Sequence, residues 1–167
     1  MDFEIRRAGP DDVPDVAEAH RDSIRAIGPR YYDEAVVSAW VGGVSPAIYL
    51  KAMARGEEFF VAVGRIGGDR KVLGFSTHRI DGDRHGTAVY VRGDAARFGV
   101  GTALFRTAEA AARAAGATSI EIDASLAAVQ FYVANGFEEV DRGELRLRSG
   151  HAMPCVFMRK TLAAARK

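Results

Sequence analysis

The sequence has few of the features that mark several large classes of protein. Only one of its 167 residues is a cysteine, Cys155, so an intrachain disulfide is excluded and a reducing compartment is favoured. No stretch approaches the about 18 consecutive apolar residues of a membrane-spanning helix, and charges occupy the N-terminal positions where a signal peptide is apolar. We therefore expect a cytoplasmic protein with no membrane partner.

An excess of charge of one sign is also missing. The chain has 23 lysines and arginines against 22 aspartates and glutamates, and its net charge of +1 gives no bulk attraction for a polyanion. The four histidines show no close metal-ligand spacing, and the single thiol has no second thiol beside it. We therefore expect no nucleic acid as a partner and no metal as a cofactor.

Length and composition fit one domain of ordinary size. A chain of this length can bury roughly two thirds of the surface that it exposes when unfolded. Its residues are 48% hydrophobic and 27% charged, as in a folded globular protein. We expect a single domain over residues 1–167, stabilised without a disulfide or a metal.

Hydrophobic periodicity predicts a mixed α/β, or α+β, order of elements. A first strand at Phe3–Arg6 precedes a helix at Val13–Ile27, in which His20 is a half-buried member of the apolar face. Two short helices follow between Gly28 and Gly56. Three antiparallel strands are then expected at 58–65, 71–79 and 87–91. The remaining elements are a helix at 100–115, a strand at 119–124, a short helix at 125–135 capped by its first residue, and strands at 137–147 and 153–162.

Glycines alternate at the start of the predicted helix at 100–115. Without Cβ atoms, Gly99 and Gly101 let the backbone approach an anion closely, and the free N–H groups of the first helical turn point toward it. A P-loop would need Gly-Lys-Ser/Thr where this chain has Gly-Thr-Ala, and a dinucleotide fingerprint would need a third glycine where Leu104 stands. A diphosphate is favoured, but not one that belongs to ATP or to a dinucleotide.

Two segments of the chain resemble one known family. The segment Ala96-Arg97-Phe98-Gly99-Val100-Gly101 resembles Q/R-x-x-G-x-G/A, the coenzyme A signature of the GNAT superfamily of N-acetyltransferases. The segment from Asp123 to Phe137 resembles the N-x-x-A-x-x-x-Y-x-x-x-G-F block of the same family. Ala96 replaces the usual Gln or Arg of the first motif, and Ser125 replaces the usual Asn of the second. More narrowly, Tyr31-Tyr32 with Trp40 looks like bacterial members of the general acetyltransferase type.

The resemblance implies a fold and a co-substrate. The expected fold is a mostly antiparallel, twisted sheet of six to seven strands, flanked by about four helices, with one splayed parallel pair formed by the strands at 87–91 and 119–124. Acetyl-CoA would lie in the gap of that pair as the acetyl donor. The residues implied to bind it are Val89, Val91, Arg97, Phe98, Gly99, Val100, Gly101, Thr102, Ser125 and Phe131.

The resemblance also assigns a catalytic residue. Tyr132 is similar to the general acid of the family, which would protonate the departing thiolate of coenzyme A. Transferring that proton is uphill by about 2 kcal/mol if both groups keep their ordinary pKa values. The base that deprotonates the acceptor is left open among several carboxylates and imidazoles, or a chain of waters. The candidates are Glu34, His78, His85, Glu121, Asp123 and His151.

The acceptor itself is expected to be a primary amine on a small molecule, an amino acid or a peptide. Tyr31 and Trp40 are expected to line its pocket, although packing of their helices onto the sheet explains both residues as well. Cys155, between apolar neighbours, is expected to be a buried strand residue and not a nucleophile.

Two other functions stay open from the sequence. The first is a sensor or interaction domain that binds acyl-CoA without catalysis, since a fold does not fix a function. The second is a toxin that acetylates charged tRNA, which the near-zero net charge disfavours. The oligomeric state is also open, with a homodimer as one alternative.

Overall fold

A computed structural model describes residues 1–163 and shows seven strands and five α-helices in this part of the chain. The strands are β1 (Phe3–Arg7), β2 (Glu58–Ile66), β3 (Asp69–Asp81), β4 (Arg84–Val91), β5 (Ser119–Ser125), β6 (Glu138–Arg146) and β7 (Ala152–Thr161). The helices are α1 (Val13–Ile27), α2 (Glu34–Gly42), α3 (Pro46–Ala54), α4 (Val100–Ala114) and α5 (Val129–Ala134). The α+β architecture predicted from the sequence is therefore confirmed.

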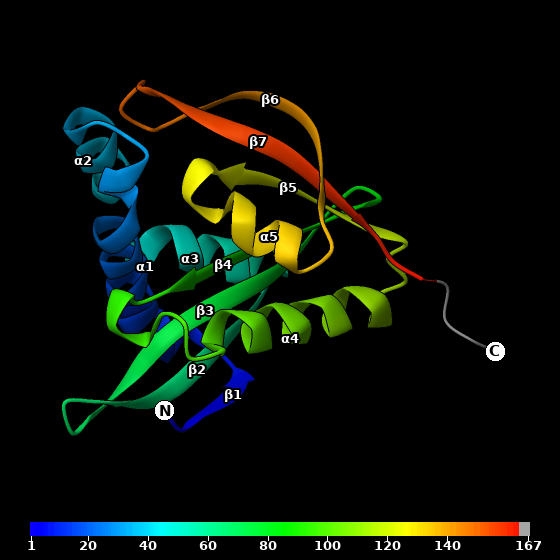
Figure 1. Ribbon diagram of the computed structural model, residues 1–167. Helices are drawn as coiled ribbons and strands as arrows, with labels where there is room; N and C mark the ends of the chain where they lie inside the picture. Colours follow the sequence, from blue (N-terminus) through cyan, green and yellow to red (C-terminus); the bar gives the residue numbers. More distant parts are fainter. Residues whose placement is uncertain (164–167) are drawn as a thin grey trace.

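The strands form two sheets that meet at β4 and β5 (Figure 1). The first sheet has the order β1-β2-β3-β4 and the second has the order β5-β7-β6, and every hydrogen-bonded pair is antiparallel. Arg84 at the start of β4 reaches Glu121 near the start of β5, and residues 87–90 farther along β4 lie beside residues 122–125 of β5, so the two strands run in the same direction. They share no ladder of backbone hydrogen bonds, so the splay of the expected parallel pair divides the sheet in two.

Helices cover both faces of the first sheet. Helix α1 and the short helices α2 and α3 lie on one face, and α4 lies on the other, with α5 beneath the second sheet (Figure 1). Strand β2 is buried on both faces through Val63, which explains its nearly continuous apolar sequence. The same alternation in β4 directs Val89 toward α4 and Tyr90 toward α1.

Several element boundaries differ from the predictions for identifiable reasons. The hairpin of β3 and β4 continues to the turn at Gly82, whose φ of 63° closes the hairpin, so both strands are longer than predicted. The predicted helix at 125–135 is a 3-10 turn at Leu126–Ala128 followed by α5. Ser125 precedes that turn but makes no capping hydrogen bond with its side chain, so the predicted cap is wrong.

No single helix among residues 1–163 is long and apolar enough to cross a membrane. Helices α2 and α3, which meet at 55°, satisfy the length and composition of a broken span only when they are taken together.

Candidate active site

The loop before α4 presents a row of backbone N–H groups. Within residues 1–163, the amides of residues 97–102 donate to no backbone carbonyl. Arg97 and Gly99 have left-handed conformations, with φ of 66° and 82°, and turns of this kind form concavities lined by N–H groups. For Arg97 the conformation costs about 1–2 kcal/mol. Strain of this kind is concentrated at functional sites, and here it supports an anion site at the N-terminus of α4.

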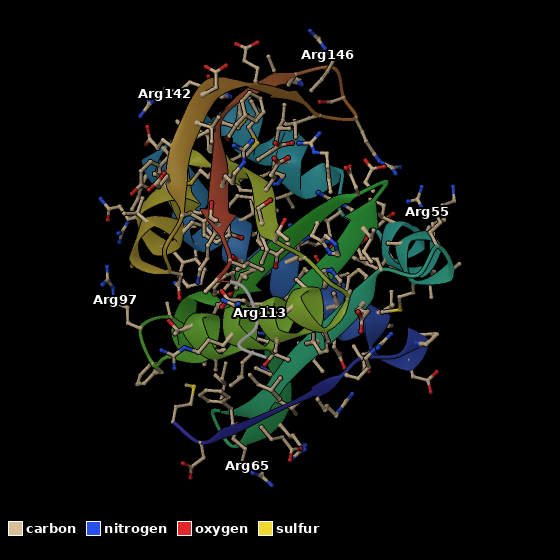
Figure 2. All side chains as sticks on the ribbon, turned by 90° about the vertical axis from the view of Figure 1, so that its right-hand side faces the viewer. Arg55, Arg65, Arg97, Arg113, Arg142 and Arg146 are labelled. Atoms are coloured by element: carbon tan, nitrogen blue, oxygen red, sulfur yellow. The ribbon has the colours of Figure 1, made fainter. Side chains whose placement is uncertain are left out.

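Side chains around this loop leave the backbone accessible. The Arg97 side chain extends outward from the loop (Figure 2), and Phe98 is 54% exposed. A Cβ added to Gly101 would lie 3.1 Å from Cε2 of Phe131 and 3.5 Å from a methyl group of Val91. The missing Cβ of Gly101 therefore allows the start of α4 to pack closely against Phe131 and Val91.

A narrow cleft lies in that gap and reaches into the molecule between the two sheets. Its lining residues come from β4, β5 and the segment that leads into α5. They are Thr87, Ala88, Val89, Tyr90, Ile122, Asp123, Ala124, Ser125, Ala128 and Tyr132. The structure therefore brings the predicted residues Val89, Ser125 and Tyr132 into one cleft, and Gly101 of the loop lies beside Phe131, the neighbour of Tyr132.

Tyr132 is the buried phenol of the cleft. The residue is 4% exposed and its ring packs against Phe131 and Phe137, with centroids 5.2 and 5.1 Å away. Burial, followed by the electrostatic influence of Tyr90, raises the pKa of Tyr132 above its ordinary value, although a hydrogen bond from the Val89 backbone lowers it in part. Tyr132 is therefore neutral at physiological pH and can donate a hydrogen bond into the cleft.

Tyr90 faces the cleft from the α1 side, and the sequence analysis gave it no role. Its ring packs 3.9 Å from the ring of His20 and 5.5 Å from Phe75, measured between centroids. Burial raises the pKa of Tyr90 to about 12, and Tyr32 adds to this shift. The sequence could have indicated Tyr90 by its place in β4, next to Val89. Whether its side chain faces the cleft, however, depends on how β4 and β5 splay apart.

His20 supports Tyr90 from α1. Its Nδ1 lies 2.6 Å from the Tyr49 hydroxyl, while its Nε2 is buried without a hydrogen-bond partner among the described residues. Burial lowers the pKa of His20 to about 3, with a smaller contribution from Arg21, so the imidazole is neutral. The half-buried position predicted for His20 is confirmed.

The three aromatic residues at the start of the chain's helical region have different places. Tyr31 is 43% exposed and lines no part of the cleft, whereas Tyr32 is 8% exposed. The Tyr32 hydroxyl donates to the Pro154 carbonyl at 2.6 Å and accepts from the Leu126 amide at 2.8 Å, so it fixes the turn that follows β5. Trp40 packs edge-on against Tyr32 and Tyr90, with centroids 5.9 and 6.5 Å away.

Only one of the six candidate bases lines the cleft, namely Asp123. Glu121 is bound by Arg84 and Arg159 at 2.6 and 2.9 Å, and these hydrogen bonds, that of Arg84 first, lower its pKa. His78 is buried between Glu58 and His85, at 3.0 and 2.8 Å.

The other candidates lie elsewhere. His151 bonds to Ser149 in the β6–β7 turn, and Glu34 lies in the first turn of α2. Cys155 is 2% exposed in β7, and burial raises the pKa of its thiol, with Asp123 and Glu144 adding to the shift. The predicted burial of Cys155 is therefore confirmed. In residues 1–163 no three His, Cys, Asp or Glu side chains gather as ligands for a metal ion.

Comparison with known proteins agrees with this geometry. The family model described as acetyltransferase (GNAT) domain matches residues 28–162. A search of curated proteins found no match. Since the family model covers most of the chain, the chain belongs to the GNAT acetyltransferases.

Solved structures share the fold. A GCN5-related N-acetyltransferase from Rhodopseudomonas palustris is 24% identical, with a TM-score of 0.81 and 97% of each chain covered. The PaiA N-acetyltransferase from Thermoplasma acidophilum, solved with coenzyme A, is 19% identical, with a TM-score of 0.75 and coverage of 97% of this chain and 100% of that one. YncA from Salmonella typhimurium, solved with acetyl-CoA, is 18% identical, with a TM-score of 0.66 and coverage of 100% and 98%.

Proposed function

We propose that the protein transfers an acetyl group from acetyl-CoA to the nitrogen of a primary amine, by direct attack while both substrates are bound. The observation that carries this proposal is the row of free amides at 97–102, which lies beside Val91 and Phe131, the chain neighbours of the cleft residues Tyr90 and Tyr132. Neighbours of the same fold were solved with coenzyme A or acetyl-CoA. We also propose the cytoplasm as its location, because the only thiol is the buried Cys155.

The co-substrate fits the chemistry of these residues. The free amides and the N-terminus of α4 attract a diphosphate, and the pantetheine amides can pair with the unpaired backbone edges of β4 and β5. The thioester would then enter the cleft from the α4 side. Tyr132 and Val89 lie on this side, whereas Tyr90 lies toward α1, and we place the acceptor on that second side.

The reaction balances without a metal or a redox group. The neutral amine nitrogen attacks the thioester carbonyl carbon, so a C–N bond forms, and the C–S bond breaks when the tetrahedral intermediate collapses. The nitrogen loses a proton to Asp123 or to water, and the thiolate gains one from solvent. The products are an N-acetylated amine and coenzyme A.

We infer that Tyr132 acts as a hydrogen-bond donor to the departing sulfur. Its pKa is raised by burial, which widens the gap to a thiol of pKa about 8.5 and makes complete proton transfer less favourable. A hydrogen bond to a developing thiolate is strengthened in a site that excludes water. The expected role therefore changes from general acid to stabilisation of the leaving group.

Release of free thiol from acetyl-CoA tests the proposal. The wild-type protein is assayed with 1,4-diaminobutane, 2-phenylethylamine, L-lysine, an alanine-initiated peptide and phosphinothricin, and product mass confirms the acetylated nitrogen. Tyr132→Phe is expected to lower kcat at least tenfold, which is about 1.4 kcal/mol, and to leave the Kd of acetyl-CoA within twofold.

Three results would count against parts of this proposal. Equal turnover by Tyr132→Phe would remove the phenol from the mechanism. Tight acetyl-CoA binding without thiol release for any amine would favour the alternative function, a non-catalytic acyl-CoA sensor. Absence of acetyl-CoA binding would reject both functions.

A further inference from the structure

Asp123 is the only Asp or Glu among residues 1–163 that lines the cleft. The residue is exposed and makes no ion pair or hydrogen bond with its side chain within residues 1–163. The other acidic residue of β5, Glu121, accepts hydrogen bonds from Arg84 and Arg159. A single carboxylate without a partner gives this part of the cleft a negative charge.

Strand alternation sets the side from which this carboxylate acts. Ile122 and Ala124 are buried in the cluster that contains Phe105 of α4, so Asp123 between them points to the opposite face of the sheet. Tyr90 points to that same face from β4. Asp123 and Tyr90 therefore border the cleft from its two strands, on the side away from the proposed entry of acetyl-CoA.

Aromatic side chains surround Tyr90 on this side. The Tyr90 ring is held among His20, Phe75 and Trp40, and Trp40 contacts Tyr32. Of the residues that the structure describes, 1–163, no Lys, Arg or His lines the cleft. Arg148 borders a different hollow, between the α2–α3 turn and the β6–β7 turn, which shares no lining residue with the cleft.

Resting on the proposed function, we propose that Asp123 and Tyr90 form the acceptor subsite, and that the acceptors are primary amines on an apolar or aromatic stem with no carboxylate beside the amine. The Asp123 carboxylate attracts the protonated amine, and the Tyr90 hydroxyl can accept a hydrogen bond from its N–H. An α-carboxylate would lie almost as near to Asp123 as the nitrogen does, and like charges at such distances repel. An α-amino acid is therefore disfavoured by charge and not by size.

Two matched probes separate charge from shape. 2-Phenylethylamine and L-phenylalanine have the same ring and chain and differ by the carboxylate next to the nitrogen. We expect kcat/KM with acetyl-CoA to be at least tenfold higher for 2-phenylethylamine. In Asp123→Asn this selectivity ratio is expected to fall at least threefold, whatever happens to the absolute rates, because the intrinsic reactivity of each probe is unchanged.

Two controls make the ratio specific to Asp123. Glu144→Gln removes a carboxylate that also influences Cys155 but lines no part of the cleft, so its ratio should equal that of the wild type. If Asp123→Asn does not fold, the wild-type ratio is measured from about 0.05 to 0.5 M salt, where screening weakens a charge effect and leaves a steric effect unchanged.

The outcomes distinguish this inference from the proposed function. A wild-type ratio near one, or a ratio that neither Asp123→Asn nor salt reduces, would overturn the acceptor subsite while acetyl transfer itself stands. Thiol release with neither probe nor any other amine would overturn the proposed function instead.

Discussion

The two ends of the β4–β5 pair differ in how their polar groups are satisfied. At the closed end, Glu121 of β5 is bound by Arg84 of β4 and Arg159 of β7, and His78 lies between Glu58 and His85. At the open end, the amides of residues 97–102 have no backbone acceptor among the described residues. The closed end thus supplies internal partners that join the sheets, whereas the open end retains bonding capacity for a ligand.

This difference identifies the functional end better than residue type does. Buried or partly buried polar groups are normally paired, so groups that stay unpaired point to a ligand or to water. By residue type alone, the histidines and Glu121 of the closed end were as attractive as Asp123. Their partners in the structure remove them from the list of candidate bases that face the cleft.

The largest expected effect concerns His20, whose ring packs against Tyr90. Its pKa is about 3 in the folded protein and about 6.5 in an unfolded chain. Below pH 6.5 the unfolded state binds a proton that the folded state excludes, so the free energy of unfolding should fall as pH falls, by up to about 1.4 kcal/mol per pH unit. Between pH 7 and 5 the fall is about 2 kcal/mol.

Urea unfolding of the wild type and of His20→Phe between pH 7 and 5 measures this contribution. The difference between the two unfolding free energies should change with pH, since the other titrating groups are shared. His20→Phe also deprives the Tyr49 hydroxyl of its partner, which lowers stability equally at every pH. If the unfolding free energies of the two proteins changed equally with pH, His20 would take up a proton in the folded state as readily as in the unfolded chain.

The next effect concerns Gly101, in the first turn of α4. In Gly101→Ala the added Cβ would approach Phe131 to 3.1 Å and push its ring, so the turn that presents the free amides should shift, and we expect acetyl-CoA to bind about tenfold more weakly, or about 1.4 kcal/mol. The free energy of unfolding should change little, because the preference of alanine for a helix, about 1 kcal/mol over glycine, offsets the close contact with Phe131. Calorimetric titration and thermal unfolding measure the two effects.

Gly9→Ala is the matched control, because its new Cβ meets nothing within 4 Å and lies in the turn before α1. Its acetyl-CoA affinity should equal that of the wild type. Unchanged affinity in Gly101→Ala would show that the ligand does not depend on the packing of Gly101 against Phe131. The assignment of the open end as the binding end would then lose this support.

The parts of the site that the sequence predicted are local in the chain. The glycine turn at Gly99 and the helix after it depend on residues a few positions apart, and Tyr132 follows at a fixed spacing within the second motif. The order of strands also follows from local alternation and turn residues. These predictions needed no knowledge of contacts between distant segments.

The parts that the sequence could not predict depend on long-range contacts. Tyr31 and Tyr32 are adjacent and chemically identical, yet only Tyr32 reaches Pro154, 122 residues away. Whether Tyr90 faces the cleft depends on how far β4 and β5 diverge. Likewise, the ion pairs of Glu121 come from Arg84 and Arg159 on two other strands, and no spacing in the sequence announces them.

The smallest expected effect concerns Glu121, at the closed end. Its pKa is lowered in the fold by hydrogen bonds from Arg84 and Arg159, so its contribution to stability is fully present above the ordinary glutamate pKa and is lost as pH falls through the lowered pKa. Because the arginines are largely exposed, we expect Glu121→Gln to lower the free energy of unfolding by only about 0.5 kcal/mol at pH 7. The loss should be much smaller at about pH 3, where the carboxylate is protonated in both states.

Urea unfolding at the two pH values measures this loss, and Glu4→Gln, which breaks the exposed pair with Arg70, provides the control for an ordinary surface ion pair. The affinity for acetyl-CoA should stay within twofold in both variants, since neither carboxylate lines the cleft. A tenfold loss of affinity or turnover in Glu121→Gln alone would mean that the closed end sets the width of the open end. The ion pairs of Glu121 would then be coupled to ligand binding, and the closed end would not be purely structural.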